Sequence, residues 1–262
     1  ARLGRGPRRP PVVGSFQGVA RGEYRAAARL LRSADRVACV SEELAAELAR
    51  AGLPAERLLV IHNAVAAAPA VPGDGDVVAG TSPPLVVAVG RLVSQKNHER
   101  LLLAARRVRE RGVPASFAVV GGGPLHDRLV ARATELGLGD VVRFTGVRTD
   151  ARAIMARADL VAFSSDWEGL SIAALEALAA GTPVVSTPAH GMRELLGGGA
   201  GAVAASMDPV ELGDLIADVL GDPRRRAAMG AAGRRLVAER FSSEAMLDAY
   251  ERLYSEALSA RG

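Results

Sequence analysis

The sequence has a single cysteine, Cys39, among 262 residues, so no disulfide can form within the chain and a reducing compartment is expected. Cys39 lies in an apolar run, which favours a small buried residue over a nucleophile. Aromatic residues make up only 3% of the chain, which argues against an aromatic stacking surface for single-stranded nucleic acid. The core must therefore be built mainly from Ala, Val and Leu.

Lysine is equally scarce, because Lys96 is the only one and the remaining Lys+Arg total is all arginine. The net charge of +4 is scattered over helical stretches of alternating sign, as on ordinary solvated faces, so we expect no nucleic-acid partner. No apolar run approaches the ~20 residues that span a bilayer, and no signal peptide is recognisable, which predicts a soluble protein. The four histidines lack metal-ligand spacing, which predicts no metal site.

The dominant pattern is an alternation of short apolar runs with longer amphipathic ones, which is typical of a parallel sheet with helices on both faces. This predicts an α/β fold with Rossmann-like topology. The predicted strands of the larger block are Leu85–Val89, Ser116–Val120, 141–144, Leu160–Phe163 and 183–186. Its predicted helices are 95–111, 124–137, 149–157, 169–180 and 190–196, followed by helices from 208, at 223–239 and at 243–259.

A smaller block precedes this one, with predicted strands at 11–15, 36–40 and 58–61 and helices at 22–32 and 42–51. Residues 64–84 are rich in Ala, Pro and Gly without periodicity, which predicts a linker. Since two or three strands rarely form a stable sheet alone, we interpret the smaller block as the remnant of a larger domain, completed by further chain or by a partner. The predicted domains are 1–66, 67–241 and a closing helix at 242–262.

Ligands of such sheets bind beyond the carboxyl ends of the strands. The first strand of the larger block is followed by Gly90 and Arg91, and then by Lys96. Arg91 offers a planar fork for phosphate oxygens, and Lys96 a compact charge at the start of the next helix. A cation there opposes the helix dipole unless an anion lies between them. The alternative is two surface cations, which the uniqueness of Lys96 disfavours.

Two glutamates follow the fourth strand, with Glu168 before the predicted helix and Glu176 inside it, seven residues between them. Glu176 is the only charged residue of the segment 170–180. If this helix packs deep, Glu176 needs hydrogen-bond donors, and vicinal sugar hydroxyls are suitable. A solvent face shared with Ala173 and Ala180 is an equal alternative.

Two further loops are candidate ligand sites. Gly121-Gly122-Gly123-Pro124 follows the second strand, although a plain strand–helix turn explains it about as well. His190-Gly191-Met192 follows the fifth strand at a helix start, where backbone N–H groups could hold an anion or a sugar. An exposed loop histidine is an equally good explanation of His190.

In their order and spacing, these motifs resemble the retaining glycosyltransferases of the GT-B type, glycosyltransferase family 4, also called glycosyl transferases group 1. The resemblance extends over about residues 11–255. The residues that carry it are Gly90-Arg91-Leu92 with Gln95-Lys96, Gly121-Gly122-Gly123-Pro124, Phe144-Thr145-Gly146, Ala158-Asp159, and Glu168 and Glu176 with Gly181-Thr182-Pro183-Val184-Val185.

The resemblance implies a role for each of these residues. Arg91 and Lys96 would bind the donor diphosphate and stabilise the departing nucleotide. Glu168 would contact the sugar ring, and Glu176 would hold the ribose hydroxyls. The predicted catalytic residues are thus Arg91, Lys96 and Glu168. The other predicted donor-binding residues are Gly90, Gly122, Val147, Arg148, His190, Gly191, Met192 and Glu176, with Val147 and Arg148 near the base.

The resemblance further implies that domain 67–241 binds the donor and that 1–66 belongs to the acceptor side. The nucleoside-diphosphate sugar is a substrate, and no separate cofactor is expected. The acceptor would be a sugar, a lipid-linked molecule or a small molecule. The enzyme is expected in the cytoplasm of a bacterium, with peripheral association of the full-length protein at the inner face of the membrane left open.

The sequence departs from the family pattern in two places. Gln17 occupies the position of a histidine that faces the donor sugar, and it cannot exchange a proton near neutral pH. The family's first strands and their glycine-rich loop have no counterpart, so the chain is interpreted as an N-terminally truncated piece or a degenerate form. The closing helix, which packs back onto the absent domain, is expected to expose part of its apolar face.

Other functions remain to be weighed. A non-catalytic nucleotide-sugar-binding module, or an inactive fragment of such an enzyme, is the main alternative to the transferase. A nucleotide-sugar epimerase is disfavoured because it is not expected to combine Arg91 and Lys96 with the spacing of Glu168 and Glu176. A dinucleotide dehydrogenase is disfavoured because no Gly-x-Gly-x-x-Gly follows the first strand of either block.

Overall fold

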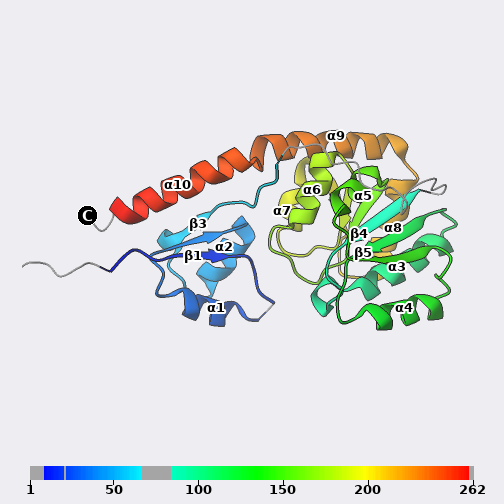
Figure 1. Ribbon diagram of the computed structural model, residues 1–262, viewed down its shortest axis with the longest axis horizontal. Coiled ribbons are helices and arrows are strands. Elements are labelled where there is room, and N and C mark those ends of the chain that lie inside the picture. The colour runs from blue at the N-terminus through cyan, green and yellow to red at the C-terminus, as the bar shows by residue number, and fades with distance from the viewer. Residues whose placement is uncertain (1–8, 21, 67–83, 260–262) are drawn as a thin grey trace, which may run out of the picture.

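The computed structural model describes residues 9–20, 22–66 and 84–259, which form two parallel sheets with helices packed around them (Figure 1). We refer to residues 9–66 as the N-terminal half and to residues 84–241 as the C-terminal half. The N-terminal sheet has the order β1-β2-β3. Its elements are β1 Val13–Phe16, α1 Tyr24–Leu31, β2 Arg36–Cys39, α2 Glu42–Arg50, the 3-10 turn Ala55–Arg57 and β3 Leu58–Val60.

The C-terminal sheet has six parallel strands in the order β6-β5-β4-β7-β8-β9, so the strand order reverses between β4 and β7. A crevice forms at such a reversal beyond the carboxyl ends of the strands, and it is the usual ligand site of the doubly wound fold. The strands are β4 Leu85–Val89, β5 Ser116–Val120, β6 Val142–Gly146, β7 Leu160–Phe163, β8 Val184–Ser186 and β9 Gly201–Val203. The edge strand β9 was not predicted, because its three half-buried residues form no apolar run.

Helices cover both faces of the C-terminal sheet, which explains why β4 is apolar at every position. Val86 and Ala88 face one core with α3 and α8, while Leu85 and Val87 face the other with α5 and α6. The helices are α3 His98–Glu110, α4 His126–Glu135, α5 Ala151–Arg157, α6 Ile172–Ala180, α7 Met192–Leu196, α8 Pro209–Leu220 and α9 Pro223–Arg240. The core that contains Leu85 and Val87 continues into the core of the N-terminal half, so the two halves share one cluster of buried side chains.

The last helix, α10 Ser243–Ser259, runs back from α9 along the N-terminal half (Figure 1). Its Leu253 is fully buried against Ala38 and Ile61 of the small sheet. Leu247, Tyr254 and Leu258 of α10 are exposed, as expected from the sequence. Among residues 9–20, 22–66 and 84–259, no helix is long and apolar enough to cross a bilayer.

Several helices begin later than their periodicity predicts, and capping explains each difference. α3 begins at His98 rather than at residue 95, because Asn97 adopts a left-handed φ of 43° and its side chain accepts the N–H of Arg100. Lys96 therefore lies in the 3-10 turn Ser94–Lys96 and not at the helix start. α6 begins after the capping Ser171, and α7 begins after the left-handed Gly191. The predicted domain boundary falls on residues 67–83, which lie outside the described residues.

Candidate nucleotide-sugar site

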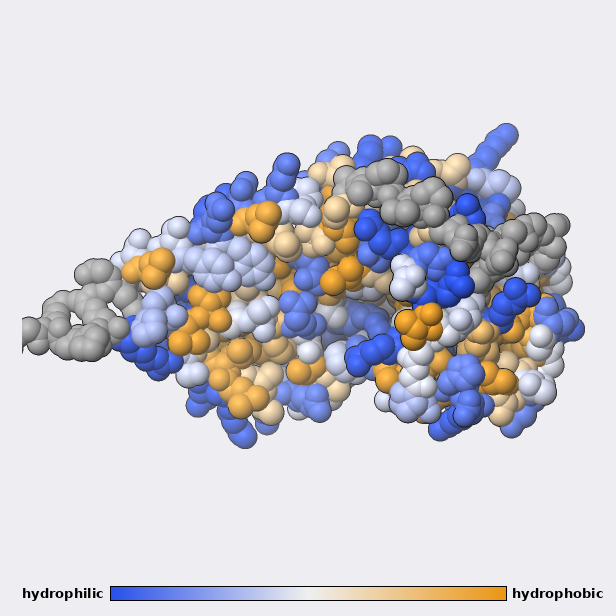
Figure 2. Space-filling view, in the orientation of Figure 1, coloured by the Kyte–Doolittle hydropathy of each residue, from blue (hydrophilic) through white to orange (hydrophobic). Residues whose placement is uncertain are grey.

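A pocket of about 370 Å³ lies where the strand order reverses, and both halves contribute to its wall. In Figure 2 the molecular surface is notched between the two halves in the lower part of the view. Residues after β4 and residues before and within the first turn of α6 form most of the lining. We call this the donor pocket, and its residues are Gln17, Asn63, Val89, Gly90, Arg91, Gln95, Lys96 and 168–173.

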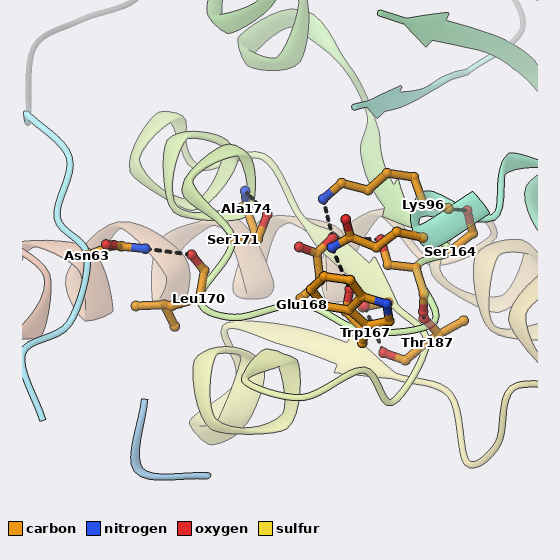
Figure 3. A network of polar contacts seen from close by, with 12 residues as sticks. Asn63, Lys96, Ser164, Trp167, Glu168, Leu170, Ser171, Ala174 and Thr187 are labelled. Carbon is orange, nitrogen blue, oxygen red and sulfur yellow. Dashed lines mark hydrogen bonds and ion pairs between the residues drawn. The ribbon is translucent and has the colours of Figure 1, made fainter. Parts of the chain in front are cut away.

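The centre of the donor pocket is an ion pair between Lys96 and Glu168. The Lys96 Nζ lies 2.5 Å from Glu168 Oε1, and the two side chains point toward one another in Figure 3. Their exposed fractions are 19% and 6%, so the pair is largely removed from water. The Ser165 hydroxyl also donates to Glu168 Oε1, at 2.6 Å. The carboxylate of Glu168 is therefore held in place by two donors.

A net of hydrogen bonds fixes the loops that carry this pair. The Gln95 amide donates to the Trp167 carbonyl at 3.1 Å, and the Ser164 hydroxyl donates to the Lys96 carbonyl at 2.9 Å. Arg100 adds a hydrogen bond to the Ser164 carbonyl at 2.6 Å. Because these contacts join the loop after β4 to the loop after β7, Lys96 and Glu168 are presented as a unit.

Arg91 and Gly90 also line the donor pocket, as predicted. Arg91 is exposed, so its guanidinium is accessible to a ligand. The stem of Lys96 packs beside Gly90, where a Cβ would lie 3.5 Å from Lys96 Cγ and Cδ. Gly121 adopts a φ of 148°, and a Cβ there would overlap the Gly90 carbonyl. The glycine run thus allows the loops after β4 and β5 to touch.

The N-terminal half contributes Gln17 and Asn63 to the donor pocket. Gln17 follows β1 and Asn63 follows β3, so both lie at carboxyl ends of strands in the small sheet. The Asn63 amide donates to the Leu170 carbonyl at 2.9 Å, which is visible in Figure 3, and to Gln17 Oε1 at 3.3 Å. Gln17 therefore lies in the pocket wall, and its contact with a bound sugar stays a prediction.

Glu176 lies beyond the donor pocket, one helical turn after the lining residue Ala173. It is half-buried, and its Oε1 lies 3.5 Å from Arg152 Nε of α5. Burial raises the pKa of Glu176, and the charge of Arg152 opposes this rise. The structure thus aligns Glu176 with the pocket along α6 without bringing it into contact with Lys96 or Glu168.

The residues predicted to face the base are also placed beside the donor pocket rather than in its wall. Val147 is 80% exposed, and a Cβ on Gly122 would lie 2.9 Å from its Cγ2. Arg148 forms two hydrogen bonds to Asp150, at 2.8 and 2.7 Å, which lower the pKa of that carboxyl. Their roles toward a base stay predictions.

His190, Gly191 and Met192 contact protein groups in this structure. The Gly191 N–H donates to Glu43 Oε2 at 2.9 Å, and the Met192 N–H donates to the Ala189 carbonyl at 3.1 Å. His190 is 15% exposed rather than an open loop residue. Its Nδ1 lies 3.0 Å from the Tyr24 hydroxyl and its Nε2 lies 3.5 Å from Glu43 Oε1. The Gly191 and Met192 N–H groups are therefore engaged by protein acceptors here, and the donor-binding roles of His190, Gly191 and Met192 stay predictions.

A second carboxylate also joins the two halves by accepting a backbone N–H, but here the carboxylate belongs to the C-terminal half. Glu194 of the C-terminal half accepts the N–H of Glu42 at the start of α2 at 3.1 Å, and His62 Nε2 lies 2.7 Å from its other oxygen. Burial alone would raise the pKa of Glu194, but His62 and the N–H groups of Glu42 and Glu43 together lower it. We call the two carboxylates Glu43 and Glu194, with His190 and His62, the clasp.

His98 is a buried histidine behind the donor pocket. It is 5% exposed, and neither ring nitrogen has a hydrogen-bond partner among the described residues. Burial lowers its pKa to about 4; the backbone of Arg91 opposes this, and the charge of Lys96 adds to it. His98 is therefore neutral at physiological pH and supports the Arg91 loop through packing.

Another cavity of the C-terminal half is larger than the donor pocket but lies elsewhere on the sheet. A larger cavity of about 580 Å³ lies between α4 and the β6 edge, and it reaches the amino ends of β4, β5 and β6. That end of a doubly wound sheet is not where ligands bind. In the part of the chain that the structure describes, no group of three or more His, Cys, Asp or Glu residues could hold a metal ion.

Comparison with known proteins agrees with this geometry. Residues 76–236 match the family described as Glycosyl transferases group 1, and residues 1–68 match Glycosyltransferase Family 4. The chain belongs to the glycosyl transferases of group 1. The family and the GT-B-like fold class predicted from the sequence motifs are thereby confirmed.

Two relatives illustrate how much of such a transferase the chain spans. The GDP-mannose-dependent alpha-(1-6)-phosphatidylinositol monomannoside mannosyltransferase of Mycolicibacterium smegmatis is 39% identical over 161 residues, 58% of this chain and 42% of the relative. The lipopolysaccharide core biosynthesis glycosyltransferase LpsE of Rhizobium meliloti is 29% identical over 93% of this chain and 71% of its own length. The chain thus matches less than half of the mannosyltransferase.

Solved glycosyltransferase structures share the arrangement of both halves. The structure of Anabaena Alr3699/HepE in complex with UDP-glucose is similar with a TM-score of 0.81 and 25% identity, over 95% of this chain and 72% of that one. Sucrose-phosphate synthase from Thermosynechococcus elongatus has a TM-score of 0.82 at 23% identity, over 95% of this chain and 68% of that one. At this identity, the similarity to sucrose-phosphate synthase concerns the fold alone.

The structure adds residues that sequence reasoning missed. Asn63 and Ser165 were not predicted as site residues, although both lie in loops that follow strands, β3 and β7. The rule that ligands bind at carboxyl ends of strands would have found them if it had been applied to polar residues in both sheets. Glu43 had no comparable signal, because only the docking of the two halves brings it to Gly191.

Proposed function

We propose that the chain is the donor-binding part of a retaining, metal-independent glycosyltransferase that uses a nucleoside-diphosphate sugar. The observation that carries the proposal is the meeting of Arg91, Lys96 and Glu168 in one pocket at the reversal of strand order. An accessible arginine and a largely dehydrated lysine there are suited to bind the oxygens of a diphosphate.

The proposed chemistry follows from where charge develops. As the bond from the sugar to the diphosphate breaks, negative charge grows on the departing nucleotide. Arg91 and Lys96 are fixed before the reaction, so they stabilise this charge more in the transition state than in the ground state. Two cations would supply the charge that a divalent metal provides elsewhere, which supports metal independence. Retention is proposed from the family resemblance of these motifs.

The carboxylates take binding roles in this proposal. Glu168 accepts from Lys96 and Ser165 and retains acceptor sites for sugar hydroxyls. Glu176 would accept from the two ribose hydroxyls of a donor that extends along α6 by one helical turn. Burial raises the pKa of Glu176, and hydrogen bonds from ribose hydroxyls would favour its ionised form.

The acceptor and the cellular setting are extrapolated from relatives. The Mycolicibacterium relative is named for a phosphatidylinositol monomannoside, and the Rhizobium relative for the lipopolysaccharide core. A sugar on a lipid-linked carrier is therefore the acceptor class that we propose, with the reaction at the cytoplasmic face of the membrane.

A calorimetric screen with UDP, GDP and ADP, each with and without EDTA, tests donor binding. We expect one nucleotide to bind with equal affinity in both buffers. A transfer assay with the matching sugar donor, read by NMR at the anomeric carbon, tests turnover and retention. Binding without turnover would support a non-catalytic nucleotide-sugar-binding module. Loss of affinity in EDTA, or an inverted product, would refute the metal-independent or the retaining part of the proposal.

A further inference from the structure

Asn63 is the one polar side chain seen to bridge the two halves inside the wall of the donor pocket, within the described residues. It follows β3 of the N-terminal sheet, and its amide nitrogen lies 2.9 Å from the Leu170 carbonyl of the loop before α6. Figure 3 shows this amide directed at Leu170 from the side opposite to Lys96 and Glu168. The same nitrogen lies 3.3 Å from Gln17 Oε1.

This bridge determines which way both amide groups face. The Leu170 carbonyl can only accept a hydrogen bond, so the atom of Asn63 that faces it must be the nitrogen. The second hydrogen of that nitrogen is directed at Gln17, which must then present its oxygen. The orientation of the Gln17 amide is thus fixed by a backbone carbonyl of the other half.

With its oxygen turned toward Asn63, Gln17 has its nitrogen turned to the other side of the amide. One hydrogen of Nε2 is donated to the Ser15 hydroxyl at 3.1 Å. Across residues 9–20, 22–66 and 84–259, the second hydrogen of Nε2 meets no protein acceptor. Gln17 is exposed and lines the donor pocket, so this N–H is available to a ligand.

The loop of Gln17 is also held against the loop of Glu168. A Cβ added to Gly169 would overlap the Gln17 carbonyl, so the two backbones are in van der Waals contact. Gly18 approaches Gly169 as well, with its Cβ position 3.5 Å from Gly169 Cα. The Gln17 amide therefore has a defined position relative to the carboxylate that the proposed function assigns to the sugar ring.

We propose that Asn63 is a positioning residue that fixes the orientation of the Gln17 amide, so that its remaining N–H is donated to an oxygen atom of the donor sugar. The proposal rests on the proposed function, because it concerns the sugar part of the same ligand. Gln17 touches the sugar, and Asn63 acts through Gln17.

The test compares a nucleoside diphosphate with its sugar conjugate, using the pair found in the donor screen. The Asn63→Ala variant should lower the affinity gained from the sugar about three- to tenfold, the contribution of one neutral hydrogen bond. Its affinity for the nucleoside diphosphate should stay within about twofold of the wild type, because that ligand does not reach Gln17. In a Gln17→Ala background, Asn63→Ala should have no further effect on the sugar conjugate.

The matched control is His62→Ala, which removes a contact between the halves one residue away without touching Gln17. It should leave the sugar-dependent gain unchanged. Equal losses for both ligands in Asn63→Ala, or additive effects of the Asn63 and Gln17 variants, would show a merely structural bridge and overturn the proposal. A wild-type chain that gains nothing from the sugar also overturns it. A wild-type chain that binds neither ligand refutes the proposed function instead.

Discussion

The donor pocket and the clasp both contain charged side chains, but these side chains differ in how fully protein partners satisfy them. In the clasp, each carboxylate contacts a backbone N–H and a histidine of the other half, as Glu194 does with Glu42 and His62. In the donor pocket, Lys96 has one carboxylate partner and Arg91 remains exposed. The clasp is therefore complete without a ligand, whereas the pocket retains cationic capacity that an anionic ligand can satisfy.

Under the proposed function, this difference separates groups that hold the halves together from groups that bind substrate. A carboxylate that caps a helix N-terminus contributes to folding. A cation held at the carboxyl end of a strand contributes to binding and turnover. Substitutions in the two regions should therefore affect different measurements.

The largest effect is expected for Lys96→Ala. Removing a fixed cation from a departing diphosphate should lower turnover about 100-fold or more, while far-ultraviolet circular dichroism shows an intact fold. The measurement is the initial rate of transfer at saturating donor. Unchanged turnover would place Lys96 outside the reaction and would remove the main contrast between the pocket and the clasp.

The next effect concerns the pH dependence contributed by His98. The pKa of His98 falls from 6.5 to about 4 on folding. Between these two pH values, His98 is therefore protonated in the unfolded chain and neutral in the folded chain. Its contribution to stability is complete above pH 6.5 and is lost as pH falls toward about 4, by on the order of 3 kcal/mol.

The variant His98→Leu should therefore lose less stability than the wild type over this window in urea titrations at a series of pH values. His126→Leu, at a histidine with a 45% exposed side chain, is the control and should follow the wild type. If the stability of His98→Leu changed with pH in parallel with that of the wild type, the lowered pKa of His98 would not be the source of this pH dependence.

A smaller effect is expected for Glu194→Gln in the clasp. The lowered pKa of Glu194 means that its ionised form is favoured by the fold. Its stabilisation is present above the ordinary glutamate pKa of 4.5 and is lost as pH falls below it. We expect Glu194→Gln to lower the free energy of unfolding by about 1–2 kcal/mol at neutral pH, with the deficit shrinking in acid.

Nucleoside-diphosphate affinity should be the same in Glu194→Gln as in the wild type, since Glu194 does not line the donor pocket. A loss of affinity without a loss of stability would mean that the clasp belongs to the binding site, against the comparison drawn above.

The smallest effect is expected at an ordinary surface pair. Arg106 pairs with Glu110 one turn later on α3, and both side chains are about half exposed, at 54% and 47%. Arg106→Ala should change the free energy of unfolding by at most about 0.5 kcal/mol and leave turnover unchanged. A turnover loss comparable to that of Lys96→Ala would indicate a general charge effect rather than a specific site.

Much of the donor pocket was predictable, because its residues follow strands directly and the strands are plain in the sequence. Gly90, Arg91, Lys96 and Glu168 were predicted from that rule and line one pocket. Gln17 was predicted from the family resemblance alone. The helix boundaries were less predictable, since Asn97 and Gly191 interrupt the backbone through conformations that apolar periodicity does not reveal.

The clasp could not be predicted for a different reason. Glu43 and Gly191 lie 148 positions apart, and Glu194 and His62 lie 132 apart. Nothing in a local pattern distinguishes Glu43 from other helical glutamates. The same limit applied to the contacts of Asn63, though not to its place after a strand, because its partners Gln17 and Leu170 come from opposite halves.

The sequence by itself determined the α/β class, the order of strands and helices, and the chemical identity of the pocket residues, because apolar periodicity and strand-end motifs are local properties. Only the tertiary structure decided that Lys96 pairs with Glu168, that Glu176 lies one helical turn away from them, and that Glu43 occupies the Gly191 N–H. Lys96 meets Glu168 because β4 and β7, distant in the sequence, are neighbours in the C-terminal sheet. Glu43 meets Gly191 because the two halves dock, and docking is set by the shape and charge of whole surfaces rather than by any short stretch of chain.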